Sequence, residues 1–202
     1  RMKTSRIIKT YRAPLFLIPA LSALLIMVIS SDLSAQYEEE SARAAWELRM
    51  NGEIQYASAM LQKLVAEQKT EGGLVHYELA RTLEHQSLGG SQEIDADQII
   101  QSSDLALKEN PENLLYACYN AQCKFSKAYM SMMQEGKTAG EDILQAVESL
   151  EKVLELDPDF HEVRVHLIEI YSQLPEDLAG NMEKAGKHTD WLEDKDTYFG
   201  CL

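Results

Sequence analysis

Two histidines in the C-terminal half come closest to a metal-binding pattern. They stand in the run His161-Glu162-Val163-Arg164-Val165-His166, within a segment that we expect to be helical. Zinc bound to one helix needs imidazoles four residues apart, whereas a five-residue spacing turns them about 140° away from each other. The sequence therefore predicts no metal site here. The remaining histidines, His76, His85 and His188, are isolated, and we expect surface or groove positions for them.

Carboxylates are abundant, but no catalytic pair can be recognised among them. A general acid with a raised pKa needs an apolar setting, and the sequence identifies none. The glycine pairs Gly72-Gly73 and Gly89-Gly90 lack the following Gly, Lys and Ser/Thr of a phosphate-binding loop, so we interpret them as turns. We expect no catalytic residue, no cofactor and no enzymatic activity.

The three cysteines do not form a disulfide pattern. Cys118 and Cys123 lie five residues apart on one predicted helix, too far and too divergent to bridge each other. Cys201 could pair with either of them only if the fold brought it back.

The charge of the chain restricts its partners. The chain has 19 basic and 33 acidic residues, of which five basic and one acidic lie within residues 1–35. Residues 36–202 therefore contain 14 basic and 32 acidic residues and carry a net charge of −18. Such a body repels phosphate backbones and anionic lipid headgroups. We expect no nucleic-acid partner. Either the acids steer a basic protein or peptide toward the chain, or they only solvate the outer faces of helices.

The first 35 residues have the three parts of a secretory signal. A basic region ends at Arg12, an uncharged stretch covers residues 13–31, and Leu33-Ser34-Ala35 precedes Gln36. We predict cleavage after Ala35 and export to the periplasm. The uncharged stretch is also long enough to cross a bilayer, so an inner-membrane anchor remains an alternative, and a buried core helix is a third. Membrane contact is expected only through residues 13–31, if they are retained.

Helical periodicity governs the rest of the chain. Apolar residues recur at three- and four-residue spacing, and the intervening turns contain glycine, proline and asparagine. Strand-like alternation is absent from the sequence. The predicted helices cover residues 38–50, 53–69, 74–87, 93–109, 112–135, 140–156, 160–174 and 180–194. The sequence therefore predicts an all-α fold of paired helices.

Several of these segments resemble tetratricopeptide repeats, in which a helix–turn–helix of 34 residues recurs. Asn51–Ala57 and Gly180–Ala185 are similar to the start of the second helix of the family's repeat. Residues 106–111 and 153–158 are similar to the end of the repeat. The resemblance covers most of residues 38–194, about four repeats. The segment from Pro175 to Gly180 also resembles a turn found in exported bacterial members of the family. The expected fold is a solenoid of stacked antiparallel helix pairs.

The resemblance also implies a binding surface. In this family the first helix of each pair lines a concave groove that holds an extended or helical peptide. The groove residues implied here are Trp46, Arg49, Tyr77, Arg81, His85, Glu169 and Gln173. Aromatic and arginine side chains are frequent anchors at interfaces. For Trp46 and Tyr77, packing between adjacent helix pairs is the alternative.

One helix pair departs from the family pattern. The pair 112–156 has a first helix that is too long, and its ambiguous register leaves it without an assigned groove residue. Tyr129, Met130, Met132 and Met133 lie toward its end. Because methionine fills irregular gaps, we expect this cluster to lie in the core, with a binding surface as the alternative.

The sequence divides into residues 1–35, a signal peptide or uncleaved anchor, residues 36–195, the repeat domain, and residues 196–202, which we expect to begin a truncated further segment. The expected function is a non-enzymatic scaffold that binds a protein or peptide partner. An accessory or regulatory repeat domain of a larger enzyme or envelope complex is one alternative, and a membrane-anchored repeat protein is another.

Overall fold

The computed structural model describes residues 36–68, 70, 72–89 and 95–195. These residues form eight α-helices and no strand. Residues 36–50 form the first helix. It is followed by α2 (Ile54–Ala66), α3 (Leu74–Leu88), α4 (Ala96–Glu109), α5 (Leu114–Met133), α6 (Ala139–Leu156), α7 (His161–Gln173), the 3₁₀ turn η1 (Glu176–Leu178) and α8 (Met182–Lys195). The predicted all-α fold is confirmed.

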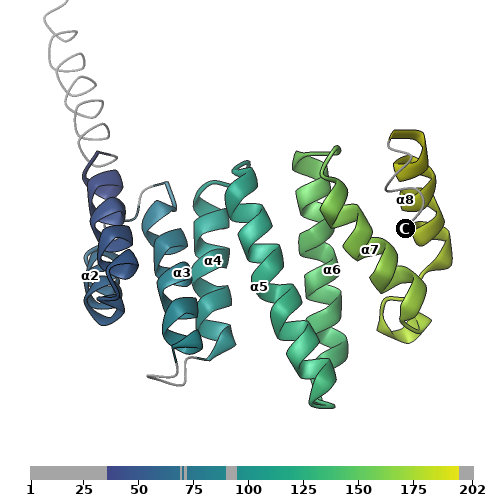
Figure 1. Ribbon diagram of the computed structural model, residues 1–202, viewed down its shortest axis with the longest axis horizontal. Coiled ribbons are helices and arrows are strands. Elements are labelled where there is room, and N and C mark those ends of the chain that lie inside the picture. The colour runs from purple at the N-terminus through teal and green to yellow at the C-terminus, as the bar shows by residue number, and fades with distance from the viewer. Residues whose placement is uncertain (1–35, 69, 71, 90–94, 196–202) are drawn as a thin grey trace, which may run out of the picture.

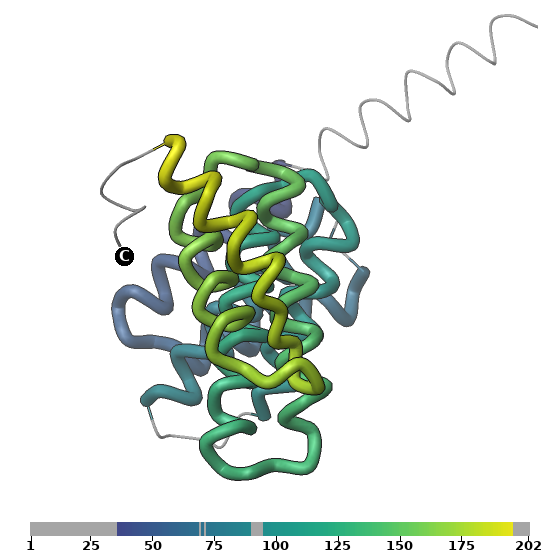
Figure 2. The backbone as a smooth tube through the Cα atoms, turned by 90° about the vertical axis from the view of Figure 1, so that its right-hand side faces the viewer, coloured from purple at the N-terminus to yellow at the C-terminus, as the bar shows by residue number. Residues whose placement is uncertain are grey.

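The helices pair in chain order, and the pairs stack into one elongated array (Figure 1). The first helix pairs with α2, α3 with α4, α5 with α6, and α7 with α8. In Figure 1 the first helices α3, α5 and α7 lie on the side toward the viewer, and Figure 2 looks along the stack from its α8 end. This arrangement places α5 between α3 and α7 on one face of the molecule.

Side-chain caps and prolines set the ends of several helices. Asp95 accepts a hydrogen bond from the backbone N–H of Asp97 at the start of α4, and Asn113 accepts one from Tyr116 at the start of α5. Pro111 and Pro158 follow the ends of α4 and α6, where a helix cannot continue. The predicted helix boundaries therefore agree with the structure to within a few residues.

The apolar stripes that the sequence predicts form three clusters along the array. One joins the first helix to α2 and α3, the next joins α3, α4 and α5, and the last joins α5 to α8. Small residues lie where helices approach closely, including Ala45, Ala57, Ala80, Ala121 and Ala185, all of which are buried. Each cluster contains residues from more than one pair, so burial depends on stacking.

Two glycines occupy positions that have no room for a side chain. Gly73 has φ +86°, and a Cβ there would lie 2.5 Å from the backbone oxygen of Ala106. At Gly180 a Cβ would lie 1.9 Å from the backbone oxygen of Leu174. The N–H of Gly180 donates to the carbonyl of Pro175, which closes the predicted turn before α8. Glycine is therefore required at both turns.

The predictions for the two ends of the chain lie outside the described residues. These are the signal or anchor within residues 1–35, cleavage after Ala35, the pairing of Cys201 and the segment 196–202. No described helix combines the length and the apolar composition that crossing a bilayer requires.

The helical register gives a test on α2. Ala57 is completely buried, whereas Ala59 on the same helix is exposed. Replacing Ala57 by Phe should lower the free energy of unfolding by about 1–3 kcal/mol, because the larger ring overfills a close contact between helices. The control Ala59→Phe should change it by less than about 0.5 kcal/mol. Urea denaturation measures both, and equal stability of the two variants would contradict the register.

Candidate functional site

The predicted groove residues fall into two groups along the array. Trp46 and Arg49 come from the first helix, and Tyr77, Arg81 and His85 come from α3. Glu169 and Gln173 come from α7. Helix α5 lies between the groups, so any surface that joins them must include residues of α5.

Arg49 lies inside the array rather than on a groove surface. Its side chain is 1% exposed, and Nη2 lies 2.8 Å from Oε2 of Glu78 on α3. This contact is an ion pair and not a hydrogen bond. Arg81 approaches the other oxygen of Glu78 at 3.4 Å. Arg49 therefore joins the first helix pair to the second and is not available to a partner.

Tyr77 is also buried, and it packs between adjacent helix pairs, which was the alternative to a groove position. Its ring stacks on Tyr116 with centroids 5.1 Å apart and meets the edge of Tyr119 at 5.3 Å. Burial, with smaller opposing effects of nearby charges, raises the pKa of the Tyr77 hydroxyl. The three rings join α3 to α5.

Trp46, Arg81 and His85 stay accessible. Trp46 is 43% exposed, and with Leu74 and Glu78 it lines a shallow depression between the first helix and α3. The guanidinium of Arg81 lies 5.4 Å from the centre of the Tyr77 ring, and His85 is exposed one turn further along α3. This end of the face combines aromatic and basic groups, but it forms no deep cavity.

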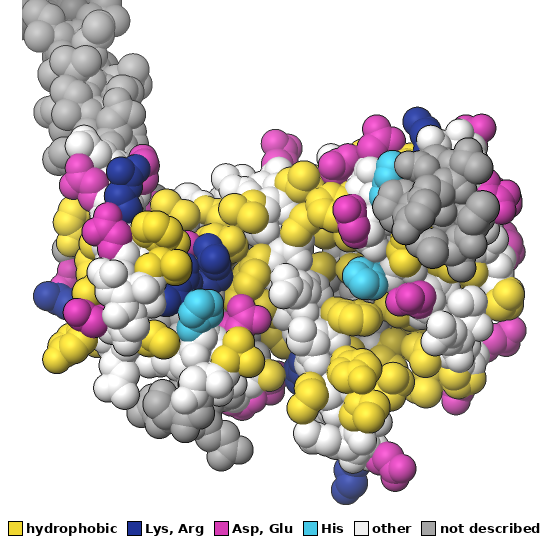
Figure 3. Space-filling model, in the orientation of Figure 1, with side chains coloured by type: hydrophobic (Ala, Val, Ile, Leu, Met, Phe, Trp, Pro, Cys, Tyr) yellow, Lys and Arg dark blue, Asp and Glu magenta, His cyan; other side chains and the backbone are white. Residues whose placement is uncertain are grey.

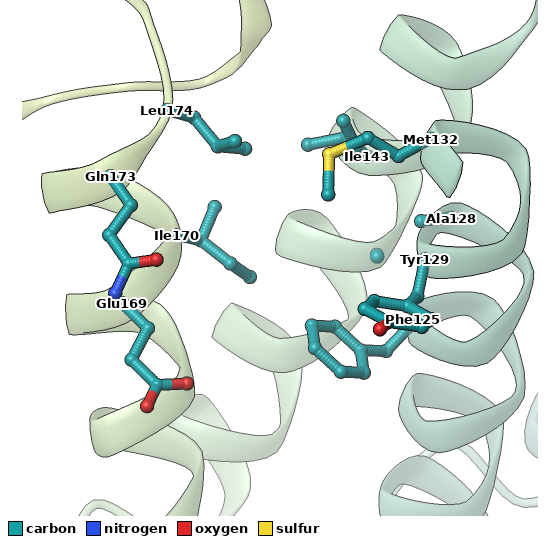
Figure 4. A pocket seen from close by; sticks show the side chains of 10 residues that line it. Phe125, Ala128, Tyr129, Met132, Ile143, Glu169, Ile170, Gln173 and Leu174 are labelled. Atoms are coloured by element: carbon teal, nitrogen blue, oxygen red, sulfur yellow. The ribbon is translucent and has the colours of Figure 1, made fainter. Parts of the chain in front are cut away.

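A more enclosed hollow opens between α5 and α7, and both predicted α7 residues line it. Figure 4 shows Glu169 and Gln173 on α7 opposite Phe125 and Tyr129 on α5. Met132 lies further along α5. The hollow has a volume of ≈ 200 Å³. This is smaller than the pockets of about 300–1,000 Å³ that hold whole small molecules.

Apolar side chains form the walls and floor of this pocket. Ile170 of α7 and Leu174, which follows this helix, face Ala128 of α5, and Ile143 of α6 lies at the back. Ala146 of α6 also lines the pocket. Among the described lining residues, Glu169 is the one that carries a charge. Figure 3 shows hydrophobic side chains gathered over the lower half of α5 and toward α7. The site therefore suits an apolar side chain.

The sequence-based prediction for the methionine cluster of α5 was wrong. Tyr129 and Met132 are 52% and 39% exposed, and Met130 and Met133 are also exposed. The buried face of α5 instead carries the alanines Ala117, Ala121 and Ala128, spaced by four and seven residues. That alanine stripe was the available signal, because on a helix it places Met130 and Met133 far from the buried side.

A polar network holds the exposed end of α5 in place. Asp142 of α6, whose side chain is 3% exposed, accepts hydrogen bonds from Ser131 at 2.7 Å and Thr138 at 2.9 Å. Lys127 lies 2.9 Å from Asp142 and 2.7 Å from Asp97 of α4. Burial alone would raise the pKa of Asp142, but hydrogen bonds from Ser131, Lys127 and Thr138 outweigh it and lower the pKa. This network fixes α5, which forms one wall of the pocket, to both α4 and α6.

The residues that could carry chemistry are dispersed. His161 meets the edge of Trp191 on α8, whereas His166 lies against Phe125 on α5. The described residues contain no group of three or more His, Cys, Asp or Glu side chains suited to a metal ion. Burial raises the pKa of Cys123 to about 11 and also raises that of Cys118, so both thiols stay protonated at neutral pH.

Comparison with known proteins bears on the fold. No protein-family model and no curated protein matches the sequence. Among solved structures, the human IFIT1 dimer with PPP-AAAA is similar to 79% of this chain, with a TM-score of 0.52 and 18% sequence identity. The match spans 33% of the IFIT1 chain. This likeness supports a tetratricopeptide-like helical repeat and concerns the fold alone.

The last helix pair contains a half-buried histidine, His188. Nη1 of Arg164 lies 3.1 Å from Nδ1 of His188, and the His188 ring stacks on Tyr171. Burial and then the Arg164 charge lower the pKa of His188, an effect that Glu151 opposes and Lys184 increases. Burial also lowers the pKa of His76, which Glu109 partly offsets. Both rings are therefore neutral in the folded protein at pH 7.

These two histidines predict a loss of stability in mild acid. Their folded-state pKa values lie below the unfolded value of 6.5, so between the two values the unfolded chain binds more protons. The free energy of unfolding should fall as the pH decreases from about 7.5 to about 5.5. His188→Gln, which keeps an acceptor for Arg164, should flatten this dependence.

Denaturation at a series of pH values measures the effect, and His85→Gln is the matched control because His85 is exposed. Asp142 and Glu151, whose pKa values are lowered from 3.8 and 4.5, lose their contributions only at lower pH. A wild-type slope in His188→Gln would contradict the assignment.

Proposed function

We propose that this chain is a non-enzymatic scaffold that binds a protein or peptide partner on the face formed by α3, α5 and α7. The observation that carries the proposal is the open apolar pocket between α5 and α7, bordered by the exposed side chains of Tyr129 and Met132. Exposed apolar patches next to a hollow are typical of protein-binding sites. A volume of ≈ 200 Å³ suits one large side chain of a partner better than a cofactor.

The proposed surface keeps five of the residues implied by the family resemblance. Glu169 and Gln173 border the pocket, and Trp46, Arg81 and His85 extend the accessible face toward the first helix pair. Arg49 and Tyr77 are left out, because their burial assigns them to contacts between pairs. They support the proposed surface by holding neighbouring helix pairs in contact.

A protein partner is favoured over a nucleic acid. The solved IFIT1 dimer holds PPP-AAAA, but in this chain residues 36–202 carry a net charge of −18. The charge on the described pocket lining comes from Glu169. Both features oppose a ligand rich in phosphate.

The proposed place of action is outside the cytoplasm. The basic region, uncharged stretch and small residues of positions 1–35 support an exported protein, either released after Ala35 or anchored through residues 13–31. This part of the proposal depends on sequence alone.

Peptide selection tests the binding function. Peptides selected from a random display library against the wild-type chain should bind the double variant Tyr129→Ala/Met132→Ala at least about tenfold more weakly, since anchor residues commonly contribute 2 kcal/mol or more. Both side chains are exposed, so the variant should keep its fold. Fluorescence anisotropy measures the affinities, and circular dichroism checks the folding.

The matched control is Tyr56→Ala/Met50→Ala, which removes an exposed Tyr and an exposed Met from the first helix pair. It should leave the affinity unchanged. The proposal fails if selection yields no binding peptide, or if the pocket variant and the control bind with equal affinity.

A further inference from the structure

Four acidic residues, which we call the rim, line the pocket between α5 and α7 or lie within three residues of its lining in the chain. Glu169 borders the pocket on α7, and the exposed Glu176 and Asp177 follow the lining residue Leu174. On the side of α5, exposed Glu135 lies three residues beyond Met132. Of these, Glu135, Glu176 and Asp177 form no ion pair with another described residue. Negative charge at the rim is therefore left without a partner in the described chain.

The nearby basic residues do not cancel this charge. Lys127 forms ion pairs with both Asp97 and Asp142, so its positive charge is already neutralised. His166 lies 3.7 Å from Glu169 and is charged only when protonated. Lys137 is exposed two residues after Glu135 and adds a single positive charge to that turn. An approaching cation would meet a net negative rim around an apolar centre.

The form of the site favours a helical occupant. The described chain contains no strand, so it offers no strand edge to which an extended peptide could add. The pocket instead lies in a groove between two helices and is lined with Met132 and aromatic rings. Such grooves accept the apolar face of an amphipathic helix, and methionine adapts to its side chains.

We infer that the pocket binds a basic amphipathic helix. One large apolar side chain of that helix enters between Phe125, Met132 and Ile170, and Lys or Arg side chains on its flanking turns face Glu169 and Glu176. This inference rests on the proposed function and specifies the chemistry of its partner.

Designed peptides test the inference directly. The probe is a fluorescein-labelled peptide of about 15 residues with Leu at i, i+3, i+4 and i+7 and Lys elsewhere. One comparison peptide replaces every Lys by Glu, and another replaces every Leu by Ala. The Leu/Lys peptide should bind the wild-type chain and gain helical circular dichroism on binding, and both comparison peptides should bind at least about tenfold more weakly.

Two variants locate the binding site. Tyr129→Ala/Met132→Ala should weaken binding of the Leu/Lys peptide by at least about tenfold. Glu169→Gln/Glu176→Gln should weaken it by about threefold to tenfold, because exposed charge pairs contribute modestly. The matched control Glu47→Gln/Glu53→Gln removes two exposed acids from the first helix pair and should leave the affinity unchanged.

The contrary outcomes are distinct. If the Leu/Glu peptide binds as tightly as the Leu/Lys peptide, the inference of a basic partner fails and only a pocket for apolar side chains remains. Equal binding of the Ala/Lys peptide, or equal losses in the rim and control variants, would show general attraction to an acidic protein and overturn the inference. Binding without a gain of helix would overturn the helical form. If no designed peptide binds while selected library peptides do, the inference fails and the proposed function stands.

Discussion

The contact of each helix pair with the next is the constraint on which the rest of this structure depends. Two antiparallel helices of this length leave apolar surface uncovered, and here that surface is buried by the neighbouring pair. The ion pair of Arg49 with Glu78 and the stacked rings of Tyr77 and Tyr116 lie at two such junctions. The face on which we propose binding depends on these junctions, because they hold α3, α5 and α7 side by side.

Much of the fold could be predicted, because a helix with one buried face needs apolar residues three and four positions apart, and the sequence shows this spacing. The stripe at Ile143, Ala146, Val147, Leu150 and Val153 is buried as a whole. Gly180 was recognised as a turn residue from its spacing to Pro175, and the backbone carbonyl of Leu174 explains why glycine is needed. Such local rules carry over directly from sequence to structure.

The candidate site was predicted only in part, because its residues depend on contacts between helices far apart in the chain. Glu169 and Gln173, which the sequence placed in the groove, are exposed and line the pocket, because the helical register of α7 is clear. The sequence could not show that Glu78 would lie opposite Arg49, since that contact joins two helix pairs. On α5 the alanine stripe did indicate the register, but the methionines were given more weight.

The division of the core into three clusters also bears on how the chain unfolds. In a linear array, stability is close to a sum of the stabilities of the units and of the interfaces between neighbours. The two tryptophans of the chain, Trp46 and Trp191, lie in the first and the last described helix pair. Their fluorescence therefore reports separately on the two ends. The two ends lose structure together only to the extent that every interface between neighbouring pairs transmits stability, and the tyrosine contacts between α3 and α5 belong to the interface in the middle of the array.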